Sequence, residues 1–340
     1  MNLPSQTQFG VLSQIKEGLD GYSCYNFSKP ANTLRSVQTH PKNTKHKQYT
    51  MADNISHDTP NIGNPIDYLI FGHLTADIIN SGQCLGGTAA FSGLTAHALG
   101  LRTGIVTAYS DGLDISPIRS LWIKNIQSEQ TTTFKNISDG IHRTQYLYQT
   151  AEKITKKDCP ELNPPPAIVH LGPMAAEVDP EIIRCYKNSL KCLTPQGWFR
   201  QTDDNFKVEY QMWENYETYL SMADIAVLSL QDVMGDEAVI GKMAVMVPIL
   251  VVTENFRGAR VYWHSDARFI NAPEVKYEDD TGAGDIFAAA FFYRYLSTKD
   301  PWEAGRFAVL LASWSVTRKY LNSIPPKEEI ERAKLELLNL

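Results

Sequence analysis

The stretch "EDDTGAGDIFAAAFFYRYL", residues 278–296, indicates both the fold and the chemistry of this chain. Three carboxylates and a Thr-Gly-Ala-Gly turn precede one more aspartate, Asp285, and a run of helix-forming residues without a breaker. The first N–H groups of a helix have no intrahelical acceptor and carry partial positive charge. Glycine lets a ligand approach such a backbone closely. The turn therefore predicts an anion pocket, suited to a phosphate, at the start of a helix.

Asp285 has two interpretations. As a structural residue it would be the helix N-cap. As a functional residue it would accept a proton from a substrate hydroxyl, while the amides of Gly282, Ala283 and Gly284 hold the phosphoryl group in transit. A capping aspartate does not require two flanking glycines, so the pattern favours the catalytic interpretation.

Apolar segments elsewhere predict the sheet. Continuous apolar runs alternate with helical patterns, which is typical of a parallel sheet covered by helices on both faces. A helix over 86–100 is predicted by its alanine content and by Gly100 at its end. The predicted strands are 66–72, 103–110, 166–173, 223–230 and 247–255.

One segment interrupts this alternation. Thr/Phe/Tyr-rich stretches flank Ser138-Asp139-Gly140, which predicts a β-hairpin at about 131–150. The hairpin could be a lid over a site, a dimer surface or a plain surface insertion.

The composition excludes some classes of protein. Hydrophobic residues make up 43% of the 340 residues, enough for a sizeable core. The net charge of −6 argues against nucleic acid as a partner. No apolar run is long enough to cross a bilayer, so we expect a cytoplasmic protein without a membrane partner. The five cysteines form no C-x-x-C pair and are expected to be reduced thiols: Cys24, Cys84, Cys159, Cys185 and Cys192.

Residues 1–60 differ from the remainder because they are polar and lack apolar periodicity. We expect a disordered extension here, followed by a single domain over 61–335. Two alternatives are a basic organelle-targeting segment within 1–50 and an upstream mis-start before Met51.

The motif "DDTGAGD" with its Ala-rich helix resembles the signature of the PfkB, or ribokinase-like, carbohydrate kinases. This resemblance implies a three-layer α/β/α fold with a mostly parallel central sheet and a small β lid. Other segments resemble the family in its own order, from about residue 66 to about 330: "FGHLTADII", "LGGTAAFSGLTAHALG", "HLGP", "TPQGWFR", "ADIAVLSLQDVMGDE", "VVTENFRGARVY" and "RFAVLLASWSVTRKYLNSIP".

The resemblance also implies site roles. Asp285 would be the catalytic base, and the Gly282–Gly284 turn, with Ala283, would be the anion hole. Asp77 would be the aspartate that ends the family's first strand and holds substrate hydroxyls. Gly86 and Gly87 would lie beside the substrate, with Phe91 where the family often has a sugar-binding Asn. ATP and Mg²⁺ are the implied cofactors, with Asp232 reaching the metal through water. The implied nucleotide-side residues are Thr253, Gly258, Thr281, Val309 and Ala312.

Four departures from the family pattern concern substrate and nucleotide preference. Phe91 and Val309 each stand where an Asn is often found, Ser229-x-x-Asp232 replaces Asn-x-x-Glu, and Asn255 replaces a glycine. Structural interpretations also exist: Asp77 could cap a turn, Gly86-Gly87 could be only a tight turn, and Thr253 could be a strand-end residue. Asp232 could be a solvated helix-start acid. His73 and His170 are interpreted as ordinary strand-end residues rather than metal ligands.

The implied function is ATP-dependent transfer of a phosphoryl group to a hydroxyl of a small sugar or polyol, including a cyclitol such as inositol. The alternatives are a nucleoside kinase of the same fold and an inactive kinase-fold binding or assembly protein. A Rossmann oxidoreductase is disfavoured, because no G-x-G-x-x-G follows the first strand. The oligomeric state is expected to be a monomer or a homodimer formed through the lid.

Overall fold

The computed structural model describes residues 65–138 and 143–338, which belong to one compact unit. The extension expected over 1–60 and residues 139–140 of the predicted turn lie outside the described residues. Within the described part of the chain, no helix is long and apolar enough to span a membrane.

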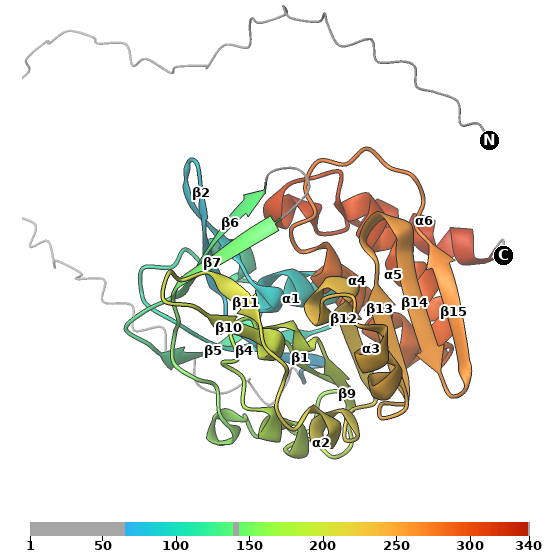
Figure 1. Ribbon diagram of the computed structural model, residues 1–340, viewed down its shortest axis with the longest axis horizontal. Helices are drawn as coiled ribbons and strands as arrows, with labels where there is room; N and C mark the ends of the chain where they lie inside the picture. Colours follow the sequence, from blue (N-terminus) through green and yellow to red (C-terminus); the bar gives the residue numbers. More distant parts are fainter. Residues whose placement is uncertain (1–64, 139–142, 339–340) are drawn as a thin grey trace, which may run out of the picture. The chain divides into compact units, whose positions relative to one another are not determined.

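A nine-stranded sheet forms the centre of the fold (Figure 1). Its strands pair in parallel except for an antiparallel edge formed by β14 and β15. The mostly parallel sheet is therefore confirmed. In spatial order the strands are β15 (Asp266–Asn271), β14 (Gly258–Trp263), β13 (Ile249–Thr253), β12 (Ile225–Ser229), β9 (Leu190–Leu193), β8 (Ile168–Leu171), β1 (Tyr68–Phe71), β4 (Thr103–Tyr109) and β5 (Trp122–Gln127).

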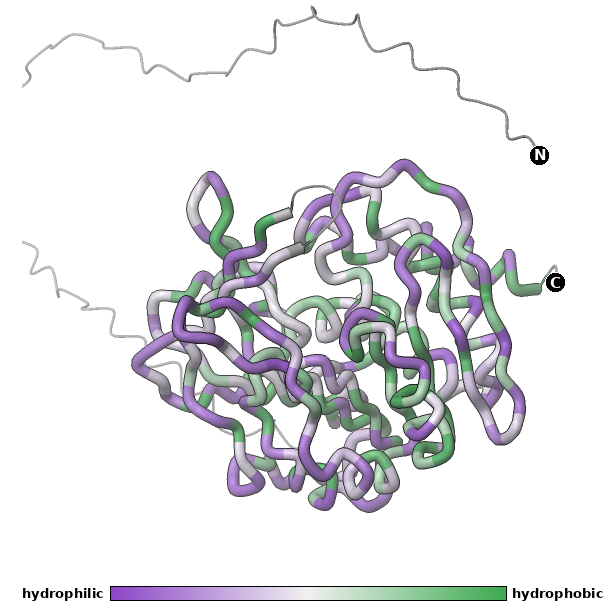
Figure 2. Tube along the Cα trace, viewed as in Figure 1, coloured by the Kyte–Doolittle hydropathy of each residue, from purple (hydrophilic) through white to green (hydrophobic). Residues whose placement is uncertain are grey.

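Both faces of this sheet are covered, which explains why its strands are apolar without alternation. In β1, Tyr68 and Ile70 pack into one core, whereas Leu69 and Phe71 pack into the other. The first core is completed by α1 (Thr88–Ala98), α4 (Ala283–Thr298), α5 (Pro301–Ser315) and α6 (Lys327–Leu338). The second is completed by α2 (Tyr216–Leu220), α3 (Glu237–Ala244) and two 3₁₀ helices, η3 (Pro180–Arg184) and η4 (Pro195–Phe199). Figure 2 shows hydrophobic residues gathered in this interior.

A separate four-stranded sheet contains the hairpin expected as a lid, and we call it the lid sheet, or lid, below. Its order is β3 (Gly82–Gly86), β2 (Thr75–Ile79), β6 (Thr132–Ser138) and β7 (Arg143–Gln149), so the expected hairpin is present as β6 and β7. One expectation needs correction, because Asp77 does not end a strand of the central sheet. The chain leaves that sheet after Phe71, and Asp77 lies in the middle of β2, opposite Cys84 and Phe134.

A second, short hairpin was not predicted. It comprises β10 (Arg200–Thr202) and β11 (Val208–Tyr210) and joins the lid through a hydrogen bond from Leu147 N to Phe206 O, at 2.8 Å. The rings of Tyr148 and Phe206 lie 5.7 Å apart across this junction. The hairpin's three-residue strands are mainly polar, so the sequence offers little alternation to reveal them.

Candidate active site

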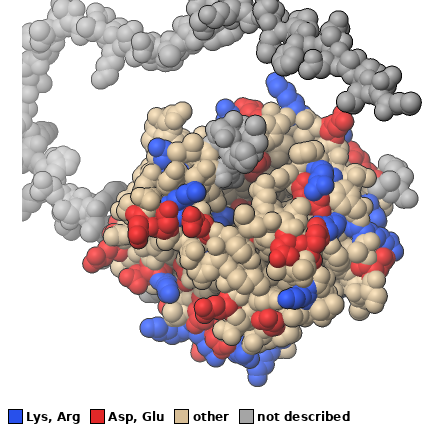
Figure 3. Space-filling model, viewed as in Figure 1, with Lys and Arg blue, Asp and Glu red and all other residues tan. Residues whose placement is uncertain are grey.

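The carboxyl ends of the parallel strands place two predicted site residues, Asp232 and Thr253, along one edge of the sheet. The chain leaves β1 toward His73, β12 toward Asp232 and β13 at Thr253. In open α/β sheets, ligands bind outside this edge. The space-filling view shows a hollow on the molecular face beside the lid (Figure 3). A separate pocket of about 580 Å³ is lined by residues from 126–129 and 152–158, and no predicted site residue lines it.

The glycine turn opens α4 as expected, but with a different cap. Gly282 is the N-cap, with φ 81°, and Asp285 is the third residue of the helix. The N-cap interpretation of Asp285 is therefore wrong. Ala283 N–H donates to Asp280 O at 3.1 Å, so this amide closes the turn rather than facing an open pocket. Gly284 is exposed, and a Cβ added there would meet nothing within 4 Å.

Asp285 is half-buried and connected to α1 through its backbone. The Ser92 hydroxyl donates to Asp285 O at 3.1 Å. This contact fixes the beginning of α4 against α1, the helix that follows the Gly86-Gly87 turn.

Below Asp285 runs a buried polar chain that the sequence did not reveal. The Tyr68 hydroxyl lies 2.8 Å from His170 Nδ1, and His170 Nε2 lies 2.8 Å from Thr194 Oγ1. Burial lowers the pKa of His170 to about 3, so the imidazole is neutral. Burial, with a contribution from the nearby Asp285 carboxylate, raises the pKa of Tyr68 well above its ordinary value. The floor of the site is therefore neutral and hydrogen-bonded.

Phe91 lies directly under the glycine turn. Its side chain is 2% exposed, and a Cβ added at Gly282 would lie 2.1 Å from a Phe91 ring carbon. The aromatic residue thus supports the turn from below, which leaves almost no ring surface for a substrate.

The two residues before α1, Gly86 and Gly87, have neighbours so close that neither position has room for a side chain. A Cβ at Gly86 would lie 2.4 Å from Asp77 Oδ2, and one at Gly87, where φ is 91°, would lie 2.5 Å from His73 O. Thr75 Oγ1 donates to Asp77 Oδ1 at 2.8 Å. The half-buried Asp77 carboxylate therefore sits over Gly86 with its orientation set by Thr75, rather than capping a turn.

Asp77 and the glycine turn belong to the same neighbourhood. Burial first, and then the carboxylates of Asp77 and Asp279, raise the pKa of the Cys84 thiol to about 11. Asp279 accepts from Thr281 N at 3.0 Å and from Thr281 Oγ1 at 2.7 Å. It also accepts from Tyr320 N at 3.3 Å, which ties the turn to η7 (Tyr320–Ser323). The predicted nucleotide-side Thr281 thus uses its hydroxyl to orient Asp279.

Arg200 was missed as a candidate, although it ends the quoted segment "TPQGWFR". Its Nη2 donates to Gln196 Oε1 at 3.0 Å, and Gln196 Nε2 donates to Thr88 Oγ1 at 2.9 Å. Its Nη1 donates to Met174 O at 3.2 Å. The Arg200 guanidinium is therefore connected, through the Gln196 side chain, to Thr88, the residue that follows the Gly86-Gly87 turn.

Asp232 lies near the same guanidinium. Its Oδ2 accepts from Ser229 N at 2.8 Å, in a capping box that begins η5 (Leu230–Val233). Burial raises the pKa of Asp232, whereas Arg200 and the Ser229 hydrogen bond oppose that rise. Asp232 is thus a helix-start acid, as the structural interpretation proposed, but it is half-buried rather than fully solvated.

The described residues hold no group of three or more His, Cys, Asp or Glu that could hold a metal ion. A Mg²⁺ ion at Asp232 would therefore fit only with donor phosphates and water as its main ligands. His73 is fully buried, with Nδ1 2.6 Å from Thr132 Oγ1 and Nε2 2.8 Å from Glu152 O. Its partners make it a structural residue at the base of the lid.

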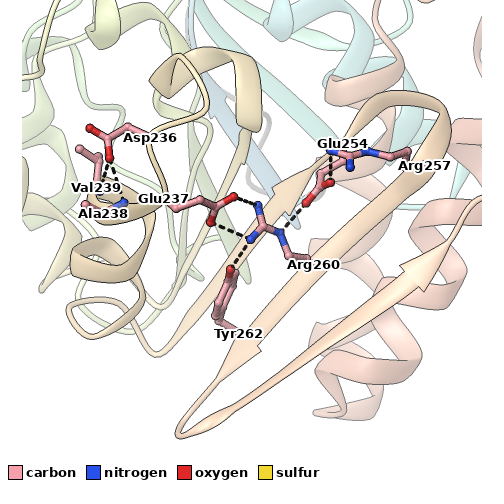
Figure 4. A network of polar contacts seen from close by, with 8 residues as sticks. All are labelled: Asp236, Glu237, Ala238, Val239, Glu254, Arg257, Arg260 and Tyr262. Atoms are coloured by element: carbon pink, nitrogen blue, oxygen red, sulfur yellow. Dashed lines mark hydrogen bonds and ion pairs between the residues drawn. The ribbon is translucent and has the colours of Figure 1, made fainter. Parts of the chain in front are cut away.

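The predicted donor loop is held by an ion-pair network (Figure 4). The Glu254 carboxylate, whose side chain is 5% exposed, contacts both Arg257 and Arg260. Arg260 also pairs with Glu237 at the start of α3, at 2.8 Å. This network fixes the residues between Thr253 and Gly258, including η6 (Asn255–Arg257).

Two glycine-like positions shape the loop. Asn255 takes the left-handed conformation with φ 53°, and Gly258 has φ 123°, with Ile270 O only 1.9 Å from an added Cβ. On α5, Val309 is 4% exposed and Ala312 is half-buried, and both pack against the core. These two residues therefore offer little or no open side-chain surface to a nucleotide.

The central sheet with helices on both faces defines a three-layer α/β/α fold. Comparison with known proteins agrees, because residues 223–328 match the model of the pfkB family of carbohydrate kinases. The resemblance of this chain to that family is thereby confirmed.

The curated relative 2-dehydro-3-deoxygluconokinase from Thermoproteus tenax is 37% identical over 86 residues. The match covers 25% of this chain and 26% of the relative, so it spans about a quarter of the relative's length.

Solved structures resemble a much larger part of the chain. A pyrophosphate-dependent kinase in the ribokinase family, complexed with a pyrophosphate analog and myo-inositol, is 21% identical with a TM-score of 0.63. The match covers 78% of this chain and 99% of that kinase chain. A structure from E. coli described as ribokinase II, in complex with ATP and Mg²⁺, is 17% identical with a TM-score of 0.64, covering 80% and 99%. At these identities the likeness confirms the fold.

Proposed function

We propose that this protein is a kinase that transfers a phosphoryl group from ATP to a hydroxyl of a small sugar or polyol, with a cyclitol such as inositol as the favoured acceptor. One observation supports the proposal most strongly. Asp285 and the open Gly284 stand at the mouth of α4, and the contacts of Phe91 and Ser92 join them to the helix that follows the Asp77–Gly86 contact. This arrangement would bring the proposed base, Asp285, close to an acceptor bound at Asp77.

The acceptor would be held by the lid residue Asp77. Its two carboxylate oxygens can accept from neighbouring hydroxyls of one substrate. Thr75 preorganises that carboxylate by donating to it. A polyol fits this arrangement because adjacent hydroxyls are the groups that a carboxylate can bind in pairs.

The reaction would proceed at the glycine turn. The acceptor oxygen attacks the γ-phosphorus, its proton passes to the Asp285 carboxylate, and the bond to the bridging oxygen breaks, with its electron pair leaving on ADP. The Gly284 amide and the positive end of α4 would stabilise the charge on the phosphoryl oxygens. Arg200, near Asp232 and the substrate turn, would add a fixed positive charge.

The donor would lie along the Thr253–Gly258 loop. Mg²⁺, when bound, would neutralise phosphate charge, with Asp232 holding it through water. The family match and the ATP–Mg²⁺ complex of a fold relative support this choice of donor. The relative complexed with a pyrophosphate analog makes pyrophosphate the first competing donor to test.

The test is a matrix of donors and acceptors. Purified protein is incubated with ATP or pyrophosphate, with Mg²⁺ or with chelator, and with sugars, inositols or nucleosides, and the phosphorylated acceptor is quantified by mass spectrometry. We expect acceptor phosphorylation with ATP, Mg²⁺ and a polyol. Preferred phosphorylation of nucleosides would favour the nucleoside-kinase alternative. Tight ATP binding without transfer to any acceptor would favour the inactive binding protein.

We also propose that the lid forms a homodimer. Its side chains Ile137 and Tyr148 are 47% and 39% exposed, and the adjoining Phe206 is 50% exposed. Sedimentation analysis of wild type and Tyr148→Lys tests this. A dimer that the substitution dissociates is expected, whereas a wild-type monomer at high concentration would contradict it.

A further inference from the structure

Two cysteines that are far apart in the sequence lie in contact on the protein. Cys159 Sγ and Cys185 Sγ are 2.7 Å apart, although 26 positions separate them along the chain. Both side chains are half-buried, so neither is sealed in the core. The cysteines in the described residues are free thiols, as expected, but the sequence did not reveal the proximity of this pair.

The surrounding backbone holds the two thiols in place. Cys159 ends η2 (Lys156–Asp158), and its N–H donates to Lys156 O at 3.3 Å. Cys185 ends η3, and its N–H donates to Ile182 O at 2.9 Å. Both cysteines thus stand at the ends of short helical turns rather than in free loops.

A separate hydrogen bond crosses between the same two segments. The hydroxyl of Tyr186, next to Cys185, donates to the carbonyl of Pro160, next to Cys159, at 2.8 Å. Tyr186 is itself buried, with its ring 6.1 Å from that of Phe71 in β1. The segments are therefore anchored to the core independently of the sulfur atoms, and the thiols meet because the fold positions them.

We propose that Cys159 and Cys185 are a modification site that a small disulfide, such as oxidised glutathione, converts into an intramolecular disulfide. One protein thiolate attacks the small disulfide, forming a mixed disulfide and releasing one small thiolate. The second protein thiolate then attacks the protein sulfur of the mixed disulfide and releases the other small thiolate. Two protein thiols are oxidised, one small disulfide is reduced to two thiols, and the two protons pass to the released thiolates.

The geometry favours the second step over a persistent adduct. The partner sulfur is already in contact, whereas a disulfide of about 2.05 Å needs only a small approach. Burial raises the pKa of the Cys159 thiol, so the first step is slow at neutral pH, because the thiolate is the nucleophile. The pair is thus a slow cross-link rather than a rapid sensor.

The cross-link would stabilise the fold by closing the chain between the two cysteines. This loop carries β8 and the segment that contacts Thr88 through Met174. A loop of about 25 residues loses enough unfolded-state entropy to raise the Tm by about 6 °C in a domain of this size.

The test uses the full chain, incubated overnight with excess oxidised glutathione at pH 8 and then alkylated and digested without reduction. We expect a Cys159–Cys185 linked peptide by mass spectrometry, a Tm higher by about 6 °C, and reversal of both by dithiothreitol. Cys159→Ser and Cys185→Ser should each lose the cross-link and the Tm shift, whereas Cys84→Ser should retain both. Comparing oxidised with reduced wild type keeps the test valid should a variant fold poorly.

Three outcomes would overturn the proposal. They are two thiols that stay free throughout, a glutathione adduct that persists on either cysteine, and a cross-link from either cysteine to a different one.

Discussion

The ring of Phe91 lies against the α-carbon side of Gly282, so closely that a Cβ on that glycine would stand 2.1 Å from a ring carbon. The first residue is on α1 and the second is the N-cap of α4. This contact sets the position of the glycine turn relative to α1, the helix that follows the Gly86-Gly87 turn. An Asn at position 91, as the family pattern would suggest, could not fill the space under the turn in the same way.

Gly282→Ala should therefore destabilise the protein. The new methyl group meets the Phe91 ring, and φ 81° is a left-handed conformation that alanine disfavours. We expect a loss of about 3 kcal/mol in the free energy of unfolding, measured by urea titration. Gly284→Ala is the matched control, because a Cβ there meets nothing within 4 Å, and it should change stability by less than about 1 kcal/mol. Equal losses in the two variants would argue against the Phe91 contact.

Arg200→Met should impair catalysis more than stability. The variant removes the positive charge beside Gln196 and Asp232, and we expect kcat/KM to fall about 10²-fold. Steady-state kinetics of acceptor phosphorylation measure this. Arg184→Met, which removes an exposed arginine paired with Glu181, is the control and should leave kcat/KM within about twofold. A fully active Arg200→Met would remove Arg200 from the proposed mechanism.

Glu254→Gln should weaken donor binding. The substitution removes the buried negative charge that pairs with Arg257 and Arg260, so the ion pairs that hold the 253–258 loop are lost. We expect the donor KM to rise several-fold, the acceptor KM to stay unchanged, and the free energy of unfolding to fall by about 2 kcal/mol. Glu237, whose side chain is 61% exposed, is the outer partner of Arg260, so Glu237→Gln should lower the free energy of unfolding by less than about 1 kcal/mol. An equal rise in both KM values would point to a general defect.

His170 should make stability depend on pH. The pKa of His170 in the folded protein is about 3, below the ordinary value of 6.5. Between these two pH values the unfolded chain therefore binds a proton at this imidazole that the folded protein does not bind. This contribution is complete above about pH 6.5 and is lost as the pH falls toward 3. Unfolding titrations of His170→Gln should show a flatter dependence than wild type between pH 6.5 and 4, by up to roughly 3 kcal/mol.

Local patterns of the sequence predicted much of this structure. The apolar runs became β1, β4, β8, β12 and β13, because strands buried on both faces leave a continuous hydrophobic signal. The glycine turn and Asp285 are adjacent in sequence, so their position at the mouth of a helix was also predictable.

Contacts between distant segments could not be predicted in this way. Arg200 approaches Asp232, Phe91 supports Gly282, and Cys159 meets Cys185 only because the strands between them pack in a particular order. Asp77 was assigned to the wrong sheet for a related reason. The apolar run over 66–72 marks the end of β1, but no local pattern assigns Thr75–Ile79 to a second sheet.

The role of Asp285 is the central claim, and a comparison of wild type with Asp285→Asn tests it most directly. Single-turnover phosphorylation of the best acceptor is measured at saturating donor, with Asp266→Asn at the exposed β14–β15 turn as a control. We predict that Asp285→Asn keeps the wild-type Tm and donor affinity but transfers phosphate about 10³-fold more slowly, whereas the control is unaffected. Transfer by Asp285→Asn within a few fold of wild type would contradict the account.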